Sequence, residues 1–268
     1  MRERALRFGR DERLVGVLSE AGDGAPRVGR PAVLVANVGV HHRIGPFRLW
    51  VELARALAAR EHAMLRFDHA GLGDSAPRTE SGDELMRAVL DVRDAMACLE
   101  RRGHHRFVVL GFCSGVDAMH AIARDDTRVV GAAFLDGYAY PTARHALHRL
   151  RRLARGEVWR GAIVRRLNRM RGEAEVSDLY SRSYPSRETC EHDLNQMASR
   201  GARLLFAFTG GAQQSFNHLG QLGEMFPSLR ERVGVDELFL PECDHLFGRV
   251  DDRERIVAAL AGWVARIR

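Results

Sequence analysis

One cysteine in this sequence is the residue best suited to covalent chemistry, because a glycine lies two residues before it and another lies two residues after it. The pentapeptide Gly111-Phe112-Cys113-Ser114-Gly115 follows an apolar run, Phe107 to Leu110, and precedes a segment with helical apolar spacing. A small-x-nucleophile-x-small pattern between a strand and a helix is typical of a nucleophile elbow, whose central residue occupies a strained turn. The helix N-terminus then favours the thiolate form of Cys113. The alternative is that Cys113 is a small apolar side chain of the core.

A histidine near the C-terminus is the candidate general base. The stretch Pro241-Glu242-Cys243-Asp244-His245 follows an expected strand, Glu237 to Leu240, and precedes an amphipathic helix, Arg253 to Ile267. A base on the loop after the last strand, later in the chain than the nucleophile, fits the order expected for such an elbow. The alternative is that His245 is one of 12 histidines and lies in a surface loop.

The carboxylate that would orient His245 is less clearly defined. The loop after the later expected strand, Leu204 to Phe208, precedes His245 in the chain and would be a suitable place for an acid. It is formed by Thr209 to Gln214, which contains neither Asp nor Glu. Asp136, at the end of the expected strand Val129 to Leu135, is the substitute candidate. It could equally be a loop-capping aspartate before Gly137, and a Cys-His dyad without an acid is a third possibility.

Oxyanion stabilisation would require two backbone N–H donors aimed at the developing charge. Ser114, directly after the candidate nucleophile, supplies one. We expect the other from the loop after Ala32 to Ala36, and we choose Val40, with Gly39 as its neighbour. Candidate substrate contacts lie on this loop and after the candidate acid: His41, His42, Arg43 and Tyr138. Solvated loop residues are the alternative for the two histidines and the arginine.

Strands and helices alternate along most of the chain, which predicts a mostly parallel, doubly wound sheet in an α/β fold. The strands expected after an opening hairpin are Ala32 to Ala36, Met64 to Phe67, Phe107 to Leu110, Val129 to Leu135, Leu204 to Phe208 and Glu237 to Leu240. From Thr142 to about Asn195 the alternation stops, and the chain becomes arginine-rich with helical periodicity. We therefore expect a single domain over 1–268, with a core of 1–140 and 201–268 and a helical lid at about 141–200.

Composition excludes several classes of chemistry. The sequence contains no lysine, so all 41 basic residues are arginine, and Schiff-base, pyridoxal phosphate and P-loop lysine chemistry are excluded. Ten arginines against Glu157 alone give residues 142–172 a local charge of +9.

The four cysteines lie far apart, which predicts neither a disulfide framework nor a zinc site. No apolar run approaches the roughly 20 residues of a membrane span, and no signal peptide is evident, so we expect a cytoplasmic protein.

Three motifs together resemble the α/β-hydrolase superfamily across essentially the whole chain: Arg66 to Ser75, Gly111 to Gly115, and Asp244-His245. The cysteine elbow is similar to that of dienelactone hydrolases. The stretch Asn37 to Pro46, taken with the elbow and with Asp136 to Tyr140, looks more like the exosortase-associated hydrolases. This resemblance implies the α/β-hydrolase fold and acyl or ester chemistry on a cellular metabolite. We expect no cofactor and no metal.

The leading hypothesis is a cysteine-dependent acyl-transfer enzyme: a thioesterase, esterase or acyltransferase that forms an acyl-Cys113 intermediate with His245 as general base. If the donor is a thioester on coenzyme A or on a carrier protein, the arginine-rich lid is a docking site for phosphate or an acidic surface, although a solvated amphipathic face explains it equally well. The alternative function is a catalytically silent hydrolase fold that binds a ligand or a partner. Nucleic-acid binding is disfavoured, because Trp159 is the only evident stacking aromatic in the basic segment.

Overall fold

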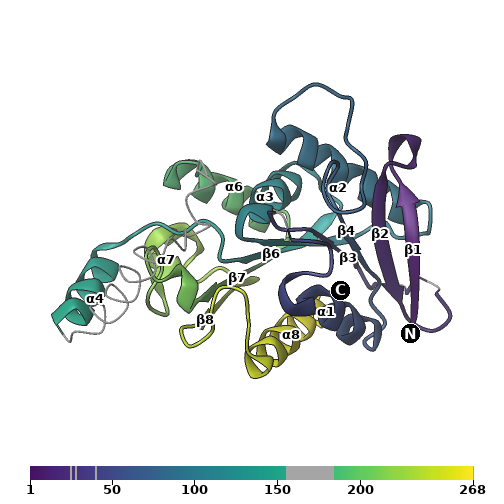
Figure 1. The fold of residues 1–268 in the computed structure, drawn as a ribbon. Coiled ribbons are helices and arrows are strands. Elements are labelled where there is room, and N and C mark those ends of the chain that lie inside the picture. The colour runs from purple at the N-terminus through teal and green to yellow at the C-terminus, as the bar shows by residue number, and fades with distance from the viewer. Residues whose placement is uncertain (25, 28, 40, 155–183, 268) are drawn as a thin grey trace, which may run out of the picture.

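The computed structural model describes residues 1–268 except for 25, 28, 40, 155–183 and 268. In the described residues, eight strands form one sheet in the order β1-β2-β4-β3-β5-β6-β7-β8 (Figure 1). The strands are β1 (Arg2–Phe8), β2 (Leu14–Glu20), β3 (Ala32–Ala36), β4 (Met64–Phe67), β5 (Phe107–Phe112), β6 (Val129–Leu135), β7 (Arg203–Thr209) and β8 (Val235–Leu240). The hairpin β1-β2 is antiparallel and β2 joins β4 antiparallel, whereas β3 to β8 run parallel. The mostly parallel sheet predicted from the alternating pattern is confirmed.

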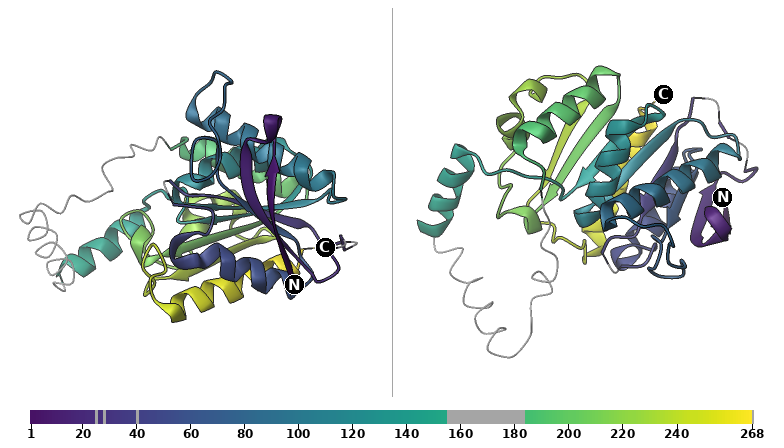
Figure 2. Two further views of the ribbon diagram at one scale, coloured as in Figure 1. Left: turned by 45° about the vertical axis from the view of Figure 1, so that its right-hand side comes forward. Right: turned by 90° about the horizontal axis from the view of Figure 1, so that it is seen from above.

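Helices cover both faces of the sheet. One face packs against α1 (Leu49–Ala58) and α8 (Val250–Ala265), and the other against α2 (Glu84–Glu100), α3 (Val116–Asp125) and α6 (Arg187–Ser199) (Figure 1, Figure 2). The remaining described helices are α4 (Ala143–Ala154), α7 (Gln221–Met225) and the 3-10 turns η1 (Arg10–Glu12), η2 (Pro46–Arg48), η3 (Cys113–Gly115), η5 (Gly210–Ala212) and η6 (Pro227–Leu229). In the described ranges, none of the helices combines the length and the apolar composition that a bilayer crossing requires.

Burial on both faces explains why the central strands are apolar without alternation. All five residues of β3 are buried; Val33 and Val35 pack with α1 and α8, whereas Leu34 packs with the opposite layer. A parallel strand covered by helices on both sides favours such a continuous run of β-branched and aliphatic residues. Fully burying side chains of this size contributes roughly 1.5–3 kcal/mol each before the entropy cost of folding.

The parallel arrangement also determines where the chemistry lies. The carboxyl ends of β5, β6 and β8 meet at one edge of the sheet, and the residues that follow these strands are Cys113, Asp136 and the loop that contains His245. Loops at this edge of an open α/β sheet form its ligand-binding crevice. Three segments far apart in the sequence are therefore brought to one place by the strand order alone.

The expected lid falls partly on residues 155–183, which lie outside the described residues. On either side of them the chain is helical: α4 extends to the far left of Figure 1, and α6 packs against α3. His120 of α3 and Asp193 of α6 form a buried contact of 3.0 Å that joins these two helices. The division into a core and a lid remains a prediction.

Candidate active site

Cys113 occupies a strained turn between β5 and α3. Its φ is 50°, in the left-handed region that a residue with a side chain rarely adopts. Its side chain is partly exposed, whereas the other three cysteines, Cys98, Cys190 and Cys243, are buried. Burial raises the pKa of Cys98, raises that of Cys190 to about 12 and that of Cys243 to about 11. Position and exposure thus distinguish Cys113 from the other thiols.

The two glycines that flank this turn have different roles. A Cβ at Gly111 would lie 2.7 Å from Cα of Val116, so α3 can approach β5 this closely only if residue 111 has no side chain. A Cβ at Gly115 would meet Val38 Cγ2 at 3.7 Å, an ordinary van der Waals contact, and the φ of Gly115 is −64°. The steric requirement for glycine expected on both sides of the cysteine therefore holds at Gly111 and not at Gly115.

A buried carboxylate lies against the candidate base. His245 Nδ1 is 2.7 Å from Asp136 Oδ2, and the Asp136 side chain is only 3% exposed. Thr209, at the end of β7, donates its backbone N–H to Asp136 Oδ1 at 2.7 Å and its hydroxyl to Oδ2 at 2.6 Å. Of the three arrangements left open by the sequence, the structure has Asp136 beside His245. Thr209 begins the segment that contains no acid, and its residue type alone did not predict that it donates to Asp136.

The ring of His245 is held between Asp136 and the thiol of Cys113, its other side-chain hydrogen-bond partner. Phe112 packs against the ring with a centroid separation of 4.8 Å, and Gly211 lies so close that a Cβ there would be 2.6 Å from His245 Cβ. Burial lowers the pKa of His245, but the hydrogen bonds to Asp136 and Cys113 outweigh it and raise the pKa to about 10. A histidine that stays protonated beside a thiol favours a thiolate-imidazolium pair.

Only one of the two candidate oxyanion donors belongs to the described residues. Ser114 is partly exposed in η3, directly after Cys113. Val40 lies outside the described residues, so its choice as the second donor remains a prediction. The preceding part of the loop rests against the elbow, because Val38 Cγ2 and the carbonyl oxygen of Asn37 are the atoms nearest to a Cβ built at Gly115. This contact places the start of the loop after β3 beside the nucleophile elbow.

Asn37 fixes the start of that loop. Its side-chain nitrogen donates to the carbonyl of Gly39 at 3.0 Å, and its side-chain oxygen accepts from the backbone N–H of His69 at 2.7 Å. The side chain is buried, and both hydrogen bonds are to backbone groups, so Asn37 determines the course of the chain rather than contacting solvent. In the sequence, Asn37 is only part of the Asn37 to Pro46 stretch, and nothing in its type or spacing indicates this role.

The four candidate substrate contacts have different surroundings. His41 is exposed, and its N–H donates to the carbonyl of Val38 at 2.9 Å. Tyr138 is nearly buried and contacts Tyr184 edge-to-face, with a centroid separation of 5.3 Å. His42 and Arg43 face two carboxylates of the loop after β4. A role in substrate binding remains a prediction for all four residues.

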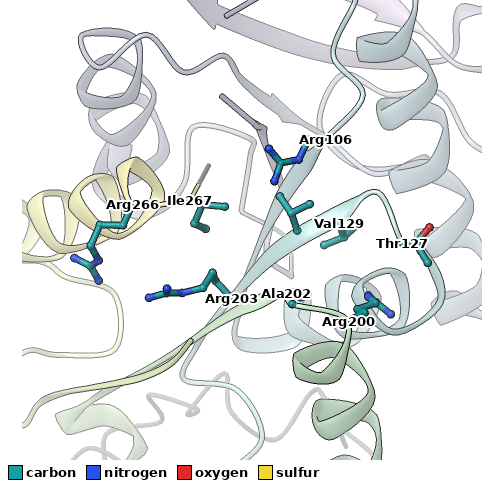
Figure 3. Close-up of a pocket in the computed structure, with 10 residues that line it drawn as sticks. Arg106, Thr127, Val129, Arg200, Ala202, Arg203, Arg266 and Ile267 are labelled. Carbon is teal, nitrogen blue, oxygen red and sulfur yellow. The ribbon is translucent and has the colours of Figure 1, made fainter. Parts of the chain in front are cut away.

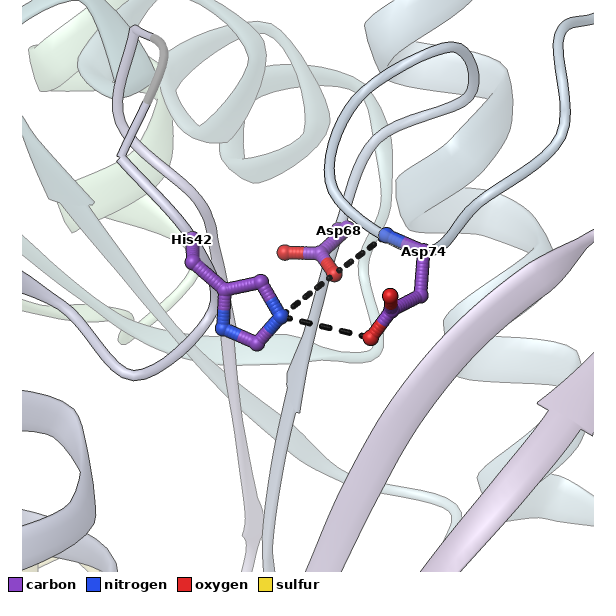
Figure 4. Close-up of side chains that lie close together, drawn as sticks. All are labelled: His42, Asp68 and Asp74. Atoms are coloured by element: carbon purple, nitrogen blue, oxygen red, sulfur yellow. Dashed lines mark hydrogen bonds and ion pairs between the residues drawn. The ribbon is translucent and has the colours of Figure 1, made fainter.

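The loop after β4 and His42 together form a group of side chains with metal-ligand chemistry. His42, Asp68 and Asp74 each offer one ligand atom, and these atoms lie within 4.8 Å of one another (Figure 4). However, Arg43 Nη1 lies at hydrogen-bond distance from all three: 2.6 Å from His42 Nε2, 2.7 Å from Asp74 Oδ2, and in contact with Asp68 Oδ2. The guanidinium group already supplies a cation at the centre of this cluster, so its residues do not fit a metal ion in this arrangement.

A cavity of about 330 Å³ lies at the opposite end of the parallel strands (Figure 3). Its lining includes four arginines: Arg106 just before β5, Arg200 just after α6, Arg203 at the start of β7 and Arg266 just after α8. Because the candidate active site lies at the carboxyl ends of the strands, this cavity does not belong to it.

Solved structures of other proteins share this architecture. The chain is similar to the esterase domain of a Rhodothermus marinus protein, with a TM-score of 0.60 and 19% identity, over 99% of this chain and 98% of that one. It is similar to an α/β hydrolase from a Penicillium species (TM-score 0.60, 13% identity, 100% and 99% covered). It is also similar to an esterase from Pyrococcus furiosus (TM-score 0.62, 11% identity, 99% and 91% covered).

These similarities establish the fold. The protein has the α/β-hydrolase fold predicted from its three motifs. Neither a protein-family model nor a curated protein matches the sequence. The subgroup resemblance, to dienelactone and exosortase-associated hydrolases, stays a prediction.

Proposed function

We propose that this protein is an enzyme that cleaves esters or thioesters through an acyl-Cys113 intermediate. The observation that carries the proposal is the chain of contacts from Cys113 through His245 to Asp136, at the carboxyl edge of the sheet. The similarity in fold to two esterases supports the choice of ester substrates. The alternative, a catalytically silent binding protein, was based on the lack of an acid in Thr209 to Gln214. Asp136 lies beside His245 and can take that role, so this argument for the alternative no longer applies.

In the first half of the reaction, the thiolate of Cys113 attacks the carbonyl carbon and forms a C–S bond. The carbonyl oxygen becomes an oxyanion, which the N–H of Ser114 and a backbone N–H of the loop after β3 stabilise. When the tetrahedral intermediate collapses, the bond to the leaving group breaks, and the imidazolium of His245 gives its proton to the departing oxygen or sulfur. The product is an acyl-Cys113 thioester and a neutral His245.

In the second half, the neutral imidazole accepts a proton from water while the water oxygen attacks the thioester. Collapse of the second intermediate releases the carboxylic acid and regenerates the thiolate beside a protonated His245. An acceptor with a hydroxyl, amine or thiol group in place of water would convert hydrolysis into acyl transfer by the same steps. Asp136 accepts the hydrogen bond from Nδ1 throughout and keeps the ring oriented.

For the donor, we propose a thioester attached to an anionic carrier. The described part of the basic segment, α4, carries three exposed arginines, Arg144, Arg149 and Arg151. Arginine pairs well with phosphate and carboxylate groups because its planar fork matches their geometry. Activity on a carrier-bound thioester should then fall as ionic strength rises, whereas activity on a small neutral ester should not.

An intact-protein mass spectrum tests the function directly. After incubation with a panel of acyl thioesters and p-nitrophenyl esters, the wild-type protein should gain the mass of one acyl group, and peptide mapping should place it on Cys113. Cys113→Ala should gain none. His245→Ala should be acylated much more slowly; equal labelling of His245→Ala and wild type would contradict the proposal, because the imidazole would then not activate the thiol.

A further inference from the structure

The end of the loop after β3 is fastened to the loop after β4 by one arginine. Arg43 Nη1 contacts Asp68 Oδ2 and Asp74 Oδ2, and the backbone N–H of Arg43 donates to Asp68 Oδ1 at 2.7 Å. Both the main chain and the side chain of Arg43 therefore bind the same carboxylate group. Contacts of this kind fix where residue 43 lies, as well as where its side chain points.

The carboxylate of Asp68 needs compensating contacts because it is fully buried, at 0% exposure. A buried carboxylate is costly unless a cation and hydrogen-bond donors compensate it. The turn around it is tight: Asp74 N–H approaches Asp68 Oδ2 at 3.3 Å, and a Cβ at Gly73 would lie only 2.4 Å from the same oxygen. Asp68 is thus a fixed anchor at the end of β4, and Arg43 is the cation in contact with it.

The loop that Arg43 ends is the one that rests against the nucleophile elbow. Its start is held by Asn37, which accepts from His69 N–H, and its middle is closed by the hydrogen bond from His41 N–H to the carbonyl of Val38. Val38 in turn lies against Gly115 of the elbow. The segment is therefore fastened at both ends to the loop after β4 and touches the elbow between them.

We propose that Arg43 is a positioning residue that holds the loop after β3 against the elbow, so that a backbone N–H of this loop meets the oxyanion formed at Cys113. This inference rests on the proposed function. Arg43 acts through the loop and through Asp68, without touching substrate, which replaces the expectation that its side chain binds the substrate. Lysine substitutes poorly, because its side chain is one bond shorter and its ammonium group does not reach the position that Arg43 Nη1 occupies between the two carboxylates.

The test compares Arg43→Ala and Arg43→Lys with wild type and with Arg55→Ala. Arg55 is a matched control, since it lies on the neighbouring helix α1, is half exposed and pairs weakly with Glu3 at 3.8 Å. Three measurements are made on each protein: kcat and KM with a p-nitrophenyl ester, the rate at which iodoacetamide alkylates Cys113, and hydrogen-deuterium exchange of residues 37–45. Alkylation requires the thiolate but develops no oxyanion, so it separates the nucleophile from the oxyanion donors.

In Arg43→Ala we expect kcat to fall about tenfold or more with little change in KM, because removing a whole oxyanion donor costs about 10²- to 10³-fold. Alkylation should stay within about twofold of wild type, and exchange over residues 37–45 should become faster. The kcat and the exchange rate of Arg43→Lys should lie between those of Arg43→Ala and wild type. Arg55→Ala should match wild type in all three measurements.

Three outcomes would overturn the inference. Unchanged exchange means that Arg43 does not hold the loop, and faster exchange with unchanged kcat means that the loop position does not matter for turnover. Equal losses of kcat and of alkylation mean that Arg43 supports the thiolate and not the oxyanion.

If Arg43→Ala does not fold, Asp74→Asn removes one contact at a 60% exposed side chain and should show the same pattern more weakly. A wild-type protein inactive on every ester defeats the proposed function, and exchange in the variants still decides whether Arg43 holds the loop.

Discussion

The hydroxyl of Thr209 donates a 2.6 Å hydrogen bond to the same oxygen of Asp136 that faces His245. Thr209 ends β7 and Asp136 follows β6, so two neighbouring strands fix the carboxylate beneath the imidazole. Because Thr209 N–H donates to the other oxygen, both oxygens of the buried carboxylate have donors even before His245 is considered. The orientation of the base is thus set by the sheet itself rather than by a mobile side chain.

Replacing this hydroxyl should weaken the site without disturbing the fold. Thr209→Val keeps the side-chain shape but removes the donor to Asp136 and the acceptor of Gly211 N–H. A hydrogen bond to a charged group contributes about 1.5–3 kcal/mol, so we expect kcat/KM to fall by about tenfold or more. Steady-state kinetics on a p-nitrophenyl ester measures this, with Thr209→Ser as the control that restores the hydroxyl. Full activity of the valine variant would show that Asp136 needs no such support.

The identity of the acid can be tested with two aspartates that lie near His245. Asp136→Asn should lower kcat/KM by about 10²-fold or more, because the neutral amide no longer favours the imidazolium. Asp244, the residue before His245, instead accepts hydrogen bonds from the backbone of Leu246 and Gly248. Asp244→Asn should therefore retain most of the activity. A larger loss of kcat/KM in Asp244→Asn than in Asp136→Asn would show that Asp136 is not the residue that orients His245.

The raised pKa of His245 predicts how its contribution to stability changes with pH. The pKa rises from an ordinary value of 6.5 to about 10, so the folded state binds the proton more tightly than the unfolded chain does. The stabilisation is therefore complete below about pH 6.5 and is lost as the pH rises towards 10. The gap in melting temperature between wild type and His245→Gln should narrow over that range. A gap that stays constant from pH 6 to pH 10 would contradict a raised pKa.

The thiol contributes to that shift and should be separable from Asp136. Because a hydrogen bond to Cys113 helps to raise the pKa of His245, Cys113→Ser should lower this pKa, since the hydroxyl stays neutral in the same pH range. Titration of the His245 ring by NMR in the two proteins provides the measurement. Identical titration curves would mean that no thiolate forms beside the imidazole.

The two elbow glycines should respond differently to the same substitution. Gly111→Ala brings a methyl group within 2.7 Å of the α3 backbone, and we expect a loss of about 2 kcal/mol or more in the free energy of unfolding. Gly115→Ala meets only ordinary contacts at a helical φ and should change it by less than about 0.5 kcal/mol. Urea denaturation of both variants measures the difference, and equal losses would refute the steric account.

The local pattern of the chain contains enough information to place its elements and its elbow. Apolar runs of four to seven residues separated by helical periods predicted the parallel strands, because a strand covered on both faces must be apolar throughout. The glycine-framed Cys113 between such a run and a helix predicted the turn, whose φ of 50° the structure has. These features depend on neighbours in the sequence, so the sequence expresses them directly.

Contacts between distant segments were decided only by the tertiary structure. His245 and Asp136 are 109 residues apart, and Arg43 and Asp68 are 25 residues apart. The sequence left three arrangements open for Asp136 and gave no carboxylate partner for Arg43, because residue type alone does not say which carboxylate a cation meets. Strand order decides this: placing β6 between β5 and β7 puts Asp136 against Thr209 and under His245, and pairing β3 with β4 puts Arg43 over Asp68. The sequence by itself thus determines which groups are available, and the packing of the sheet determines which of them meet.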